Sequence, residues 1–387
     1  MKKIIFIKII SINLIFVSIN CMMPSSSTFS NNIEISIRQV CVPFTNLQKK
    51  PTKNNFKQEY PILSTDSPEI ESQLLFGEYV FFENKKQKFN HEKWIFVYCL
   101  EQFNANLTPL TGWIKKKDSI RISDCNYDIY DNIKKNNFIT ITKPWCPIYS
   151  KNKDFLIAIP IGTRLNFIGV STKKFSPEKI TVSSTKDKIY IYSKNIMQHF
   201  KKPFKSIPKI ANIRKNIKKI ASEFLGMPYA WGGRTPYSEN SCYQTSVDCS
   251  GFVNLLYRCC GLAIPRNSVE LYKFCNKLNS GKELETGDFV FLADTKTKTI
   301  KHVLLSLENQ KLQESIGSEK PYANRTIDFN NRFGKNKENI KSGDIIGKRI
   351  IYFGSVLNDE EKIKQINELF LNCELILANK DNVEIND

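Results

Sequence analysis

The segment DCSGFV, at residues 248–253, gives the strongest indication of the fold of this chain. A cysteine stands before an apolar run, continued by LLY at residues 255–257, that has the spacing of a buried helix face. We expect a helix that begins at Cys249, where its partial positive charge favours an anion. His302 opens a later β-like run, HVLLSL. Because thiolates attack carbonyls, a cysteine and a histidine so placed predict a thiol nucleophile with its base.

Five segments around this pair follow one another in a defined order. They are ASEFLGMPYAWGGR at 221–234, DCSGF at 248–252, LAIPRNS at 262–268, LETGDFVF at 284–291 and HV at 302–303. Together they resemble the NlpC-type family of bacterial cell-wall cysteine peptidases. The resemblance implies an α+β fold class, with a compact papain-like catalytic domain at residues 205–355.

The resemblance also implies roles for individual residues. Cys249 becomes the nucleophile, and His302 becomes the general base that later protonates the leaving amine. Asp248 occupies the position where the family binds the free α-amine of a trimmed peptide, and Ser250 and Ser268 line the same pocket. A helix cap is the alternative for Asp248, because an aspartate directly before a helix accepts first-turn backbone N–H bonds.

Two further positions are left open by the sequence. Tyr229 either contacts substrate or oxyanion or simply packs. The family's third catalytic position, often a histidine, lies about twelve residues after the catalytic histidine, and here it holds Glu314. A three-residue loop at 308–310 puts Glu314 on the face of His302, whereas a two-residue turn puts Gln313 there. We prefer Glu314, because only a carboxylate also stabilises imidazolium; an exposed strand glutamate is the other interpretation.

The other histidines and cysteines indicate no metal site, and we expect no cofactor. His91 and His199 lie beside basic segments, and the chain has no C-x-x-C pair and no H-E-x-x-H motif. The net charge of +19 predicts attraction to anionic cell-wall polymer or membrane. Its basic residues are dispersed without a recognition motif, so we expect no nucleic-acid partner.

The amino terminus predicts export. A lysine pair precedes a short apolar run at residues 4–19, which is typical of a signal peptide or an N-terminal anchor at 1–21. We therefore expect a location in the periplasm or cell envelope. Cys21 offers a possible lipid anchor, and hence membrane association through the N-terminus, although the preceding Ser-Ile-Asn is a poor processing site.

Eleven scattered cysteines do not form a dense disulfide framework. Cys41 with Cys99 or Cys125, and Cys242 near Cys249, are the bridges that the sequence leaves open. We expect most of the others to be buried thiols.

The region before the catalytic part has short β-like runs separated by polar turns. Residues 33–125 and 128–200 each resemble a small bacterial SH3-like β-barrel. We expect Trp94 and Trp113 to pack in the first barrel core rather than to contact a ligand. After the catalytic domain, residues 356–387 form a tail in which Ile363, Ile366, Leu369 and Phe370 have helical spacing.

Barrels joined to such a domain resemble γ-D-glutamyl-diamino-acid endopeptidases. We therefore predict an exported cysteine peptidase that acts on peptidoglycan or muropeptide stem peptides, at the γ-D-glutamyl-diaminopimelate bond. TPLTGW at 108–113 lacks a tyrosine that some relatives carry, and Tyr98 or Tyr127 would have to replace it. The alternatives are a non-catalytic wall-binding protein and an amidase or acyl transferase of the same fold. The bond cut, the form of the wall substrate and the oligomeric state stay open.

Overall fold

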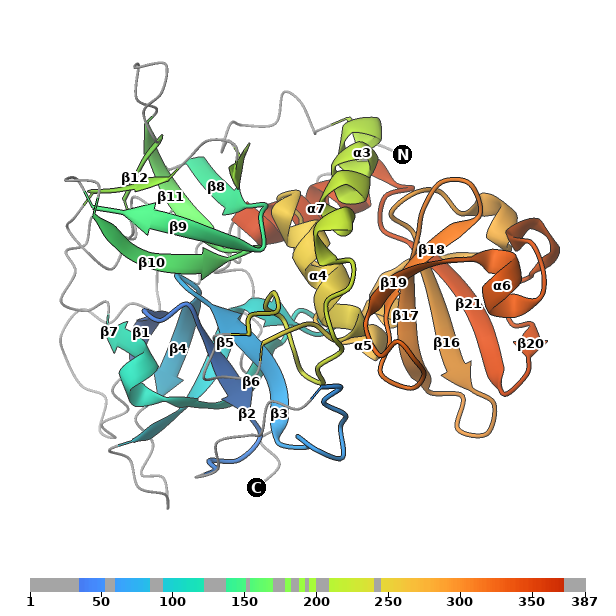
Figure 1. The fold of residues 1–387 in the computed structure, drawn as a ribbon, viewed down its shortest axis with the longest axis horizontal. Helices are drawn as coiled ribbons and strands as arrows, with labels where there is room; N and C mark the ends of the chain where they lie inside the picture. Colours follow the sequence, from blue (N-terminus) through green and yellow to red (C-terminus); the bar gives the residue numbers. More distant parts are fainter. Residues whose placement is uncertain are drawn as a thin grey trace, which may run out of the picture.

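The computed structural model describes residues 35–52, 60–83, 93–121, 137–150, 154–169, 178–181, 188–191, 195–199, 209–239 and 245–371. The predicted signal or anchor segment at 1–21 lies outside these residues, as do Cys21, His91, Cys125, Tyr127 and Cys242. Within the described ranges, no helix is both long enough and apolar enough to cross a membrane. Strands and helices are both present, in keeping with the α+β prediction (Figure 1).

A first antiparallel sheet has the described strands in the order β3-β2-β6-β5-β4-β1-β7. They are β1 (Ile35–Val40), β2 (Phe44–Gln48), β3 (Ile70–Leu75), β4 (Tyr79–Glu83), β5 (Trp94–Phe103), β6 (Pro109–Lys115) and β7 (Ser119–Arg121). Ile95, Val97 and Ile114 are in its buried core. Alternation along β5 and β6 turns Trp94 and Trp113 to the other face, where both are half-buried. The prediction that the two tryptophans pack in the core is therefore wrong.

The second sheet has the described strand order β10-β9-β13-β12-β11-β8-β14. Its strands are β8 (Asn137–Ile141), β9 (Trp145–Tyr149), β10 (Phe155–Pro160), β11 (Arg164–Gly169), β12 (Glu178–Thr181), β13 (Lys188–Ile191) and β14 (Ile196–His199). Phe76 of the first sheet region joins its apolar core, so the two sheets share buried surface. That these sheets are SH3-like barrels stays a prediction.

The third sheet runs β15-β21-β16-β17-β18-β19, with β20 paired to β21. Its strands are β15 (Asn276–Leu278), β16 (Phe289–Asp294), β17 (Ile300–Ser306), β18 (Lys311–Ser315), β19 (Asn324–Asp328), β20 (Ile345–Ile346) and β21 (Arg349–Ser355).

The helices of the described residues are α3 (Ile210–Ala221), α4 (Cys249–Cys259), α5 (Ser268–Phe274), α6 (Phe329–Phe333) and α7 (Glu360–Leu371). Short 3-10 helices are η1 (Lys116–Asp118), η3 (Ser222–Phe224), η4 (Gly281–Glu283) and η5 (Lys337–Asn339).

Helix α4 lies between the third sheet and the other two (Figure 1). Every residue of this helix is buried. On the side of the third sheet, the Tyr257 hydroxyl donates to the Gly287 carbonyl at 2.7 Å. On the side of the second sheet, the Thr140 hydroxyl donates to the Cys259 carbonyl at 2.9 Å. The helix that begins at the predicted nucleophile is thus fixed by several parts of the chain.

Helix α7 forms within the predicted C-terminal tail. Its residues Ile363, Ile366, Leu369 and Phe370 are buried, as their spacing predicts. The Ile366 carbonyl accepts from the Ala263 N–H at 2.8 Å, so the helix docks on the catalytic part of the chain. Arg164 of the second sheet donates to the Phe370 carbonyl, which ties the same helix to β11.

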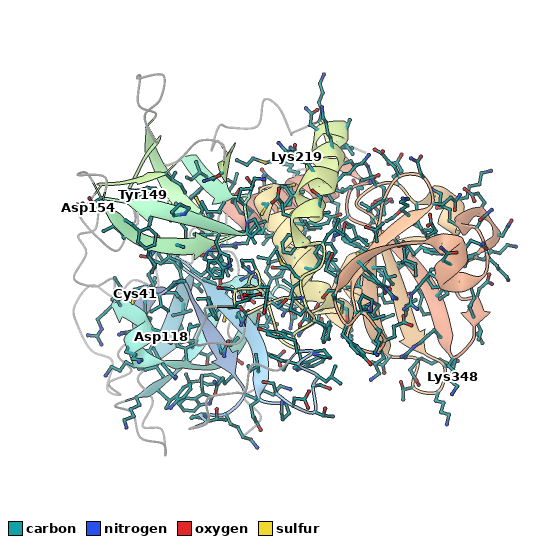
Figure 2. All side chains as sticks on the ribbon, viewed as in Figure 1. Cys41, Asp118, Tyr149, Asp154, Lys219 and Lys348 are labelled. Carbon is teal, nitrogen blue, oxygen red and sulfur yellow. The ribbon has the colours of Figure 1, made fainter. Side chains whose placement is uncertain are left out.

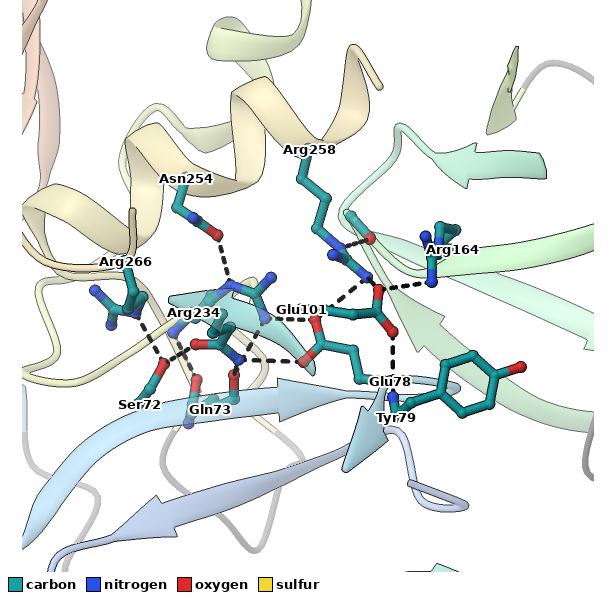
Figure 3. Close-up of polar contacts among 12 residues, drawn as sticks. Ser72, Gln73, Glu78, Tyr79, Glu101, Arg164, Arg234, Asn254, Arg258 and Arg266 are labelled. Carbon is teal, nitrogen blue, oxygen red and sulfur yellow. Dashed lines mark hydrogen bonds and ion pairs between the residues drawn. The ribbon is translucent and has the colours of Figure 1, made fainter. Parts of the chain in front are cut away.

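Two buried glutamates of the first sheet face the arginines around α4 (Figure 3). Glu78 accepts from Arg234 at 2.7 Å. Glu101 accepts from Arg258 at 2.6 Å and lies 3.2 Å from Arg164 of the second sheet. Burial alone would raise the pKa of Glu101, but Arg164 and Arg258 outweigh it and lower that pKa. The first sheet region, the second sheet and the part of the chain around α4 therefore meet at one cluster of buried, paired charges.

Removal of Glu101 tests the importance of this cluster. Glu101→Ala leaves Arg164 and Arg258 without their shared carboxylate, and we expect it to lower the free energy of unfolding by about 3–5 kcal/mol. Glu308→Ala is the control, because it breaks a half-exposed pair with Lys218 and should cost about 0–1 kcal/mol. Urea unfolding followed by circular dichroism measures both. Equal losses in the two variants would contradict a structural role for the buried cluster.

Candidate active site

Cys249 is the first residue of α4, as the sequence predicts, and it is 7% exposed. The preceding Asp248 caps the helix and accepts from the Gly251 N–H at 2.6 Å. The backbone of Gly251 lies so close to that of Gly233 that a Cβ atom added to Gly251 would be 2.1 Å from the Gly233 carbonyl oxygen. The glycines of the DCSG and WGG segments thus allow the two backbone segments to come into contact close to Cys249.

His302 faces Cys249 from β17. Its side chain is 15% exposed, and it hydrogen-bonds with the Cys249 side chain. Its Nε2 atom lies 2.8 Å from Oε2 of Glu314 on β18, which leaves Nδ1 for the thiol. The imidazole is therefore held between sulfur on one side and a carboxylate on the other, which is the geometry of a triad.

The position of Glu314 follows from the length of the β17–β18 loop. Leu305 pairs with Gln313, and the Leu307 N–H donates to the Lys311 carbonyl. Three residues thus form the loop, which is the alternative that puts Glu314 on the face of His302. Gln313 points elsewhere and donates to the Ala221 carbonyl at 2.7 Å. Glu314 is completely buried, so it is not an exposed strand glutamate.

Two arginines surround the other oxygen of Glu314. Arg325 on β19 donates to Oε1 from Nε at 3.1 Å and from Nη2 at 2.8 Å. The Nε atom of Arg332, on α6, lies 3.4 Å from the same oxygen. Neither residue was predicted from the sequence. The signal that could have found Arg325 is the β18–β19 register, in which it stands opposite Glu314.

These contacts set the charge states of the pair. Burial alone would lower the pKa of His302, but Cys249 and Glu314 outweigh it and raise that pKa to about 9. Burial likewise opposes the shift of Glu314, but His302, Arg332 and Arg325 lower its pKa to about 2. Imidazolium and carboxylate therefore coexist across the neutral range. The stabilisation by charged His302 is complete below pH 6.5 and is lost as the pH rises through about 9.

The remaining described cysteines differ from Cys249. Seven described cysteines are free, so the Cys41–Cys99 bridge that the sequence left open does not form. Burial raises the pKa of Cys146 to about 11 and that of Cys259 to about 12. Cys99, Cys146, Cys259, Cys260 and Cys275 are buried thiols, as the sequence predicts for most of the set, whereas Cys41 is half-buried.

The predicted substrate-binding residues come from sequence segments before and after Cys249. Asp248 pairs with Arg266, whose Nη1 and Nη2 atoms lie 3.1 and 2.9 Å from its two oxygens. Ser250 accepts from the same guanidinium at 2.9 Å, and Ser268 begins α5. Tyr229 is 8% exposed, and burial raises the pKa of its hydroxyl. Asp248 is thus both helix cap and ion-pair partner.

The first sheet region also reaches the site, through residues that were not identified from the sequence. Asn267, next to Ser268, donates to Glu71 of β3 at 3.0 Å. Arg266 donates to the Ser72 hydroxyl at 2.8 Å. The segment before β3 pairs with the WGG region through Ile62 and Ala230. No group of three metal-binding side chains occurs among the described residues.

Comparison with known proteins relates this site to one family. Residues 226–332 match the model of the NlpC/P60 family. The bifunctional muramidase/DL-endopeptidase CwlT of Bacillus subtilis is 30% identical over 131 residues, which are 33% of this chain and 37% of CwlT. A γ-D-glutamyl-L-lysine dipeptidyl-peptidase of Bacillus cereus is 24% identical over 68% of this chain and 71% of its own. The chain thus spans little more than a third of CwlT but most of the second relative.

A solved structure supports the likeness at the level of the fold. The crystal structure of an NlpC/P60 family protein from Bacillus cereus matches with a TM-score of 0.59 at 19% sequence identity. The match covers 76% of this chain and 95% of that one. The shared fold therefore extends well beyond residues 226–332.

The coupling of His302 to Glu314 can be measured directly. In Glu314→Gln, we expect the pKa of His302 to fall from about 9 toward its ordinary 6.5, because the imidazolium loses a charged partner. The readout is a pH titration of the His302 ring nitrogens by NMR. Glu308→Gln, at the tip of the same hairpin, should leave the titration unchanged. An unaltered His302 titration in Glu314→Gln would contradict the coupling.

Proposed function

We propose that this chain is an exported cysteine peptidase of peptidoglycan stem peptides, because residues 226–332 match the model of the NlpC/P60 family. The observation that carries the proposal is the contact of His302 with both Cys249 and Glu314, which keeps the imidazole protonated at neutral pH. The names of the curated relatives, which include a γ-D-glutamyl-L-lysine dipeptidyl-peptidase, support a γ-D-glutamyl bond as the target.

The proposed reaction runs through an acyl-enzyme. The Cys249 thiolate attacks the carbonyl carbon, and the Cys249 backbone N–H helps to hold the oxyanion. The C–N bond then breaks, and the His302 imidazolium gives its proton to the leaving amine. His302, now neutral, takes a proton from water, and the resulting hydroxide releases the acyl group from sulfur. Glu314 stays ionised and holds the imidazole in place throughout.

We propose the γ-D-glutamyl-diaminopimelate bond of a peptide with a free amino terminus. Asp248, Ser250 and Ser268 would form the amine pocket. One oxygen of Asp248 accepts three hydrogen bonds, from Gly251, Ser250 and Arg266. The other accepts one, from Arg266. This second oxygen is the less occupied of the two, and we propose that an ammonium group approaches it.

The proposed setting and organisation follow the sequence. A signal peptide or anchor at 1–21 would deliver the enzyme to the periplasm or cell envelope. SH3-like barrels at 33–125 and 128–200 would precede the catalytic domain at 205–355 and the helical tail at 356–387. The contacts of the first sheet with Asn267 and Arg266 support a role for the first barrel in shaping the amine pocket.

Cleavage of defined peptides tests the proposed reaction. We expect residues 22–387 to release L-Ala-D-Glu from L-Ala-γ-D-Glu-diaminopimelate, because the thiolate has its acid–base partner in place. Cys249→Ala should release none. N-acetylation of the peptide should reduce the rate by at least about tenfold, because the ammonium then no longer meets Asp248. Mass spectrometry follows the products. Equal cleavage of both peptides would contradict the amine pocket, and release by Cys249→Ala would contradict the nucleophile.

Thiol labelling separates catalysis from simple wall binding. At pH 7 we expect iodoacetamide to modify Cys249 fastest among the described cysteines, because His302 is protonated beside it. His302→Ala should slow this labelling by at least about tenfold, because the thiolate loses its counter-charge. Cys259, whose pKa burial raises to about 12, is the internal control. Peptide mass spectrometry gives the rates. A wall-binding module would leave Cys249 as slow as Cys259.

A further inference from the structure

A cleft of about 470 Å³ opens beside His302. Tyr229 and Trp231 line it, together with the segment after β18 and residues 63–65 of the first sheet region. The residues of the proposed amine pocket do not line this cleft. Since the amine pocket takes the acyl side of the scissile bond and His302 protonates the leaving amine, the cleft lies on the side of the leaving group.

The charged residues of this cleft are mainly cationic. Its lining includes three cationic side chains, those of Lys301, Arg332 and Arg349, and one carboxylate, that of Glu319. Glu319 is already engaged at 3.0 Å by Arg332 and at 2.7 Å by Arg325. Lys301 and Arg349 therefore add positive charge that Glu319 does not offset.

A β-bulge brings Lys301 to the cleft. Leu292 pairs with His302 and Ala293 with Ile300, so Lys301 is an extra residue on β17 without a partner on β16. Successive residues of a regular strand point to opposite faces, but a bulge redirects a side chain. Lys301 and His302 consequently line the same cleft although they are adjacent in sequence.

Arg349 lines the cleft from β21, another strand of the same sheet. It begins β21 and stands opposite Asp294 on β16. Asp294 does not line the cleft, and its carboxylate accepts from the backbone N–H groups of Lys296 and Thr297. These bonds lower the pKa of Asp294, and the charge of Arg349 contributes to the same shift. The apolar side chains of Ile351 and Phe333 also line the cleft.

We infer that this cleft binds the leaving diamino acid and that Lys301 and Arg349 recognise a carboxylate on its far carbon. The inference rests on the proposed function and specifies the substrate. Lysine and diaminopimelate have the same carbon chain to the distal amine, but diaminopimelate carries an additional carboxylate on the distal carbon. The cationic cleft favours that carboxylate and disfavours the lone ammonium of lysine. The apolar lining suits the methylene groups that both share.

Two substrates that differ by one carboxylate test this inference. The wild-type enzyme is given L-Ala-γ-D-Glu-diaminopimelate and L-Ala-γ-D-Glu-L-Lys, and kcat/KM is measured for each. We expect a ratio of at least about tenfold in favour of diaminopimelate, because one charge-assisted hydrogen bond is worth about that much. In the double variant Lys301→Met/Arg349→Met, this ratio should fall by about tenfold to a hundredfold.

Lys348→Met is the matched control. Lys348 is an exposed cation directly before Arg349, at the turn between β20 and β21, and it does not line the cleft (Figure 2). The ratio should therefore stay at the wild-type value. A ratio that falls equally in Lys348→Met, or that does not change in the double variant, would overturn the inference.

Binding to Cys249→Ala separates this inference from the proposed reaction. Calorimetric titration with the same two peptides gives their Kd values without turnover, and diaminopimelate should bind at least about tenfold more tightly. If the wild-type enzyme cleaves neither peptide but this preference persists and requires Lys301 and Arg349, the cleft assignment holds and the proposed reaction fails. If both peptides are cleaved and bound equally well, the reaction holds and the cleft assignment is wrong.

Discussion

The burial of α4 on every side is the constraint on which the rest of the structure depends. A helix with no solvent-facing side needs a protein partner for each polar group, because an unpaired buried charge is strongly destabilising. Arg258 donates to Glu101 and to the Gly162 carbonyl, and Asn254 accepts from Arg234. These partners come from three different units of the chain. The position of the helix is therefore set by the whole assembly, and with it the position of Cys249.

The other half of the site is set by one hairpin. A three-residue loop fixes the register of β17 and β18, so that Glu314 is opposite the strand that carries His302. Arg325 and Arg332 then hold the carboxylate in its charged form. Groups on paired strands are held more precisely than groups on loops, which suits a proton donor and acceptor. Helix and hairpin together bring sulfur, imidazole and carboxylate into line.

Local patterns made much of this predictable. The apolar spacing after Cys249 and the alternation after His302 are properties of short segments. Glu314 was preferred over Gln313 because only a carboxylate also stabilises imidazolium, whereas the sequence left the length of the loop open. Arg325 was not foreseen, because its contact depends on the pairing of β18 with a strand from beyond the next loop. The partners of the arginines around α4 were missed for a similar reason, since Glu78 and Glu101 belong to a separate sheet. The Trp94 prediction failed because Ile95, its neighbour on the strand, takes the buried face, and alternation turns Trp94 to the other face.

The arginines that face the first two sheets also constrain how residues 209–371 can be separated from those sheets, or joined to others, during evolution. A copy of residues 209–371 without the preceding sheets would leave Arg234 without Glu78 and Arg258 without either of its glutamates. Gene fusion or loss at this boundary therefore has to be accompanied by substitution at those positions. In this chain the buried arginines of one part are matched by glutamates of another, so recombination between the two parts is constrained by charge as much as by shape.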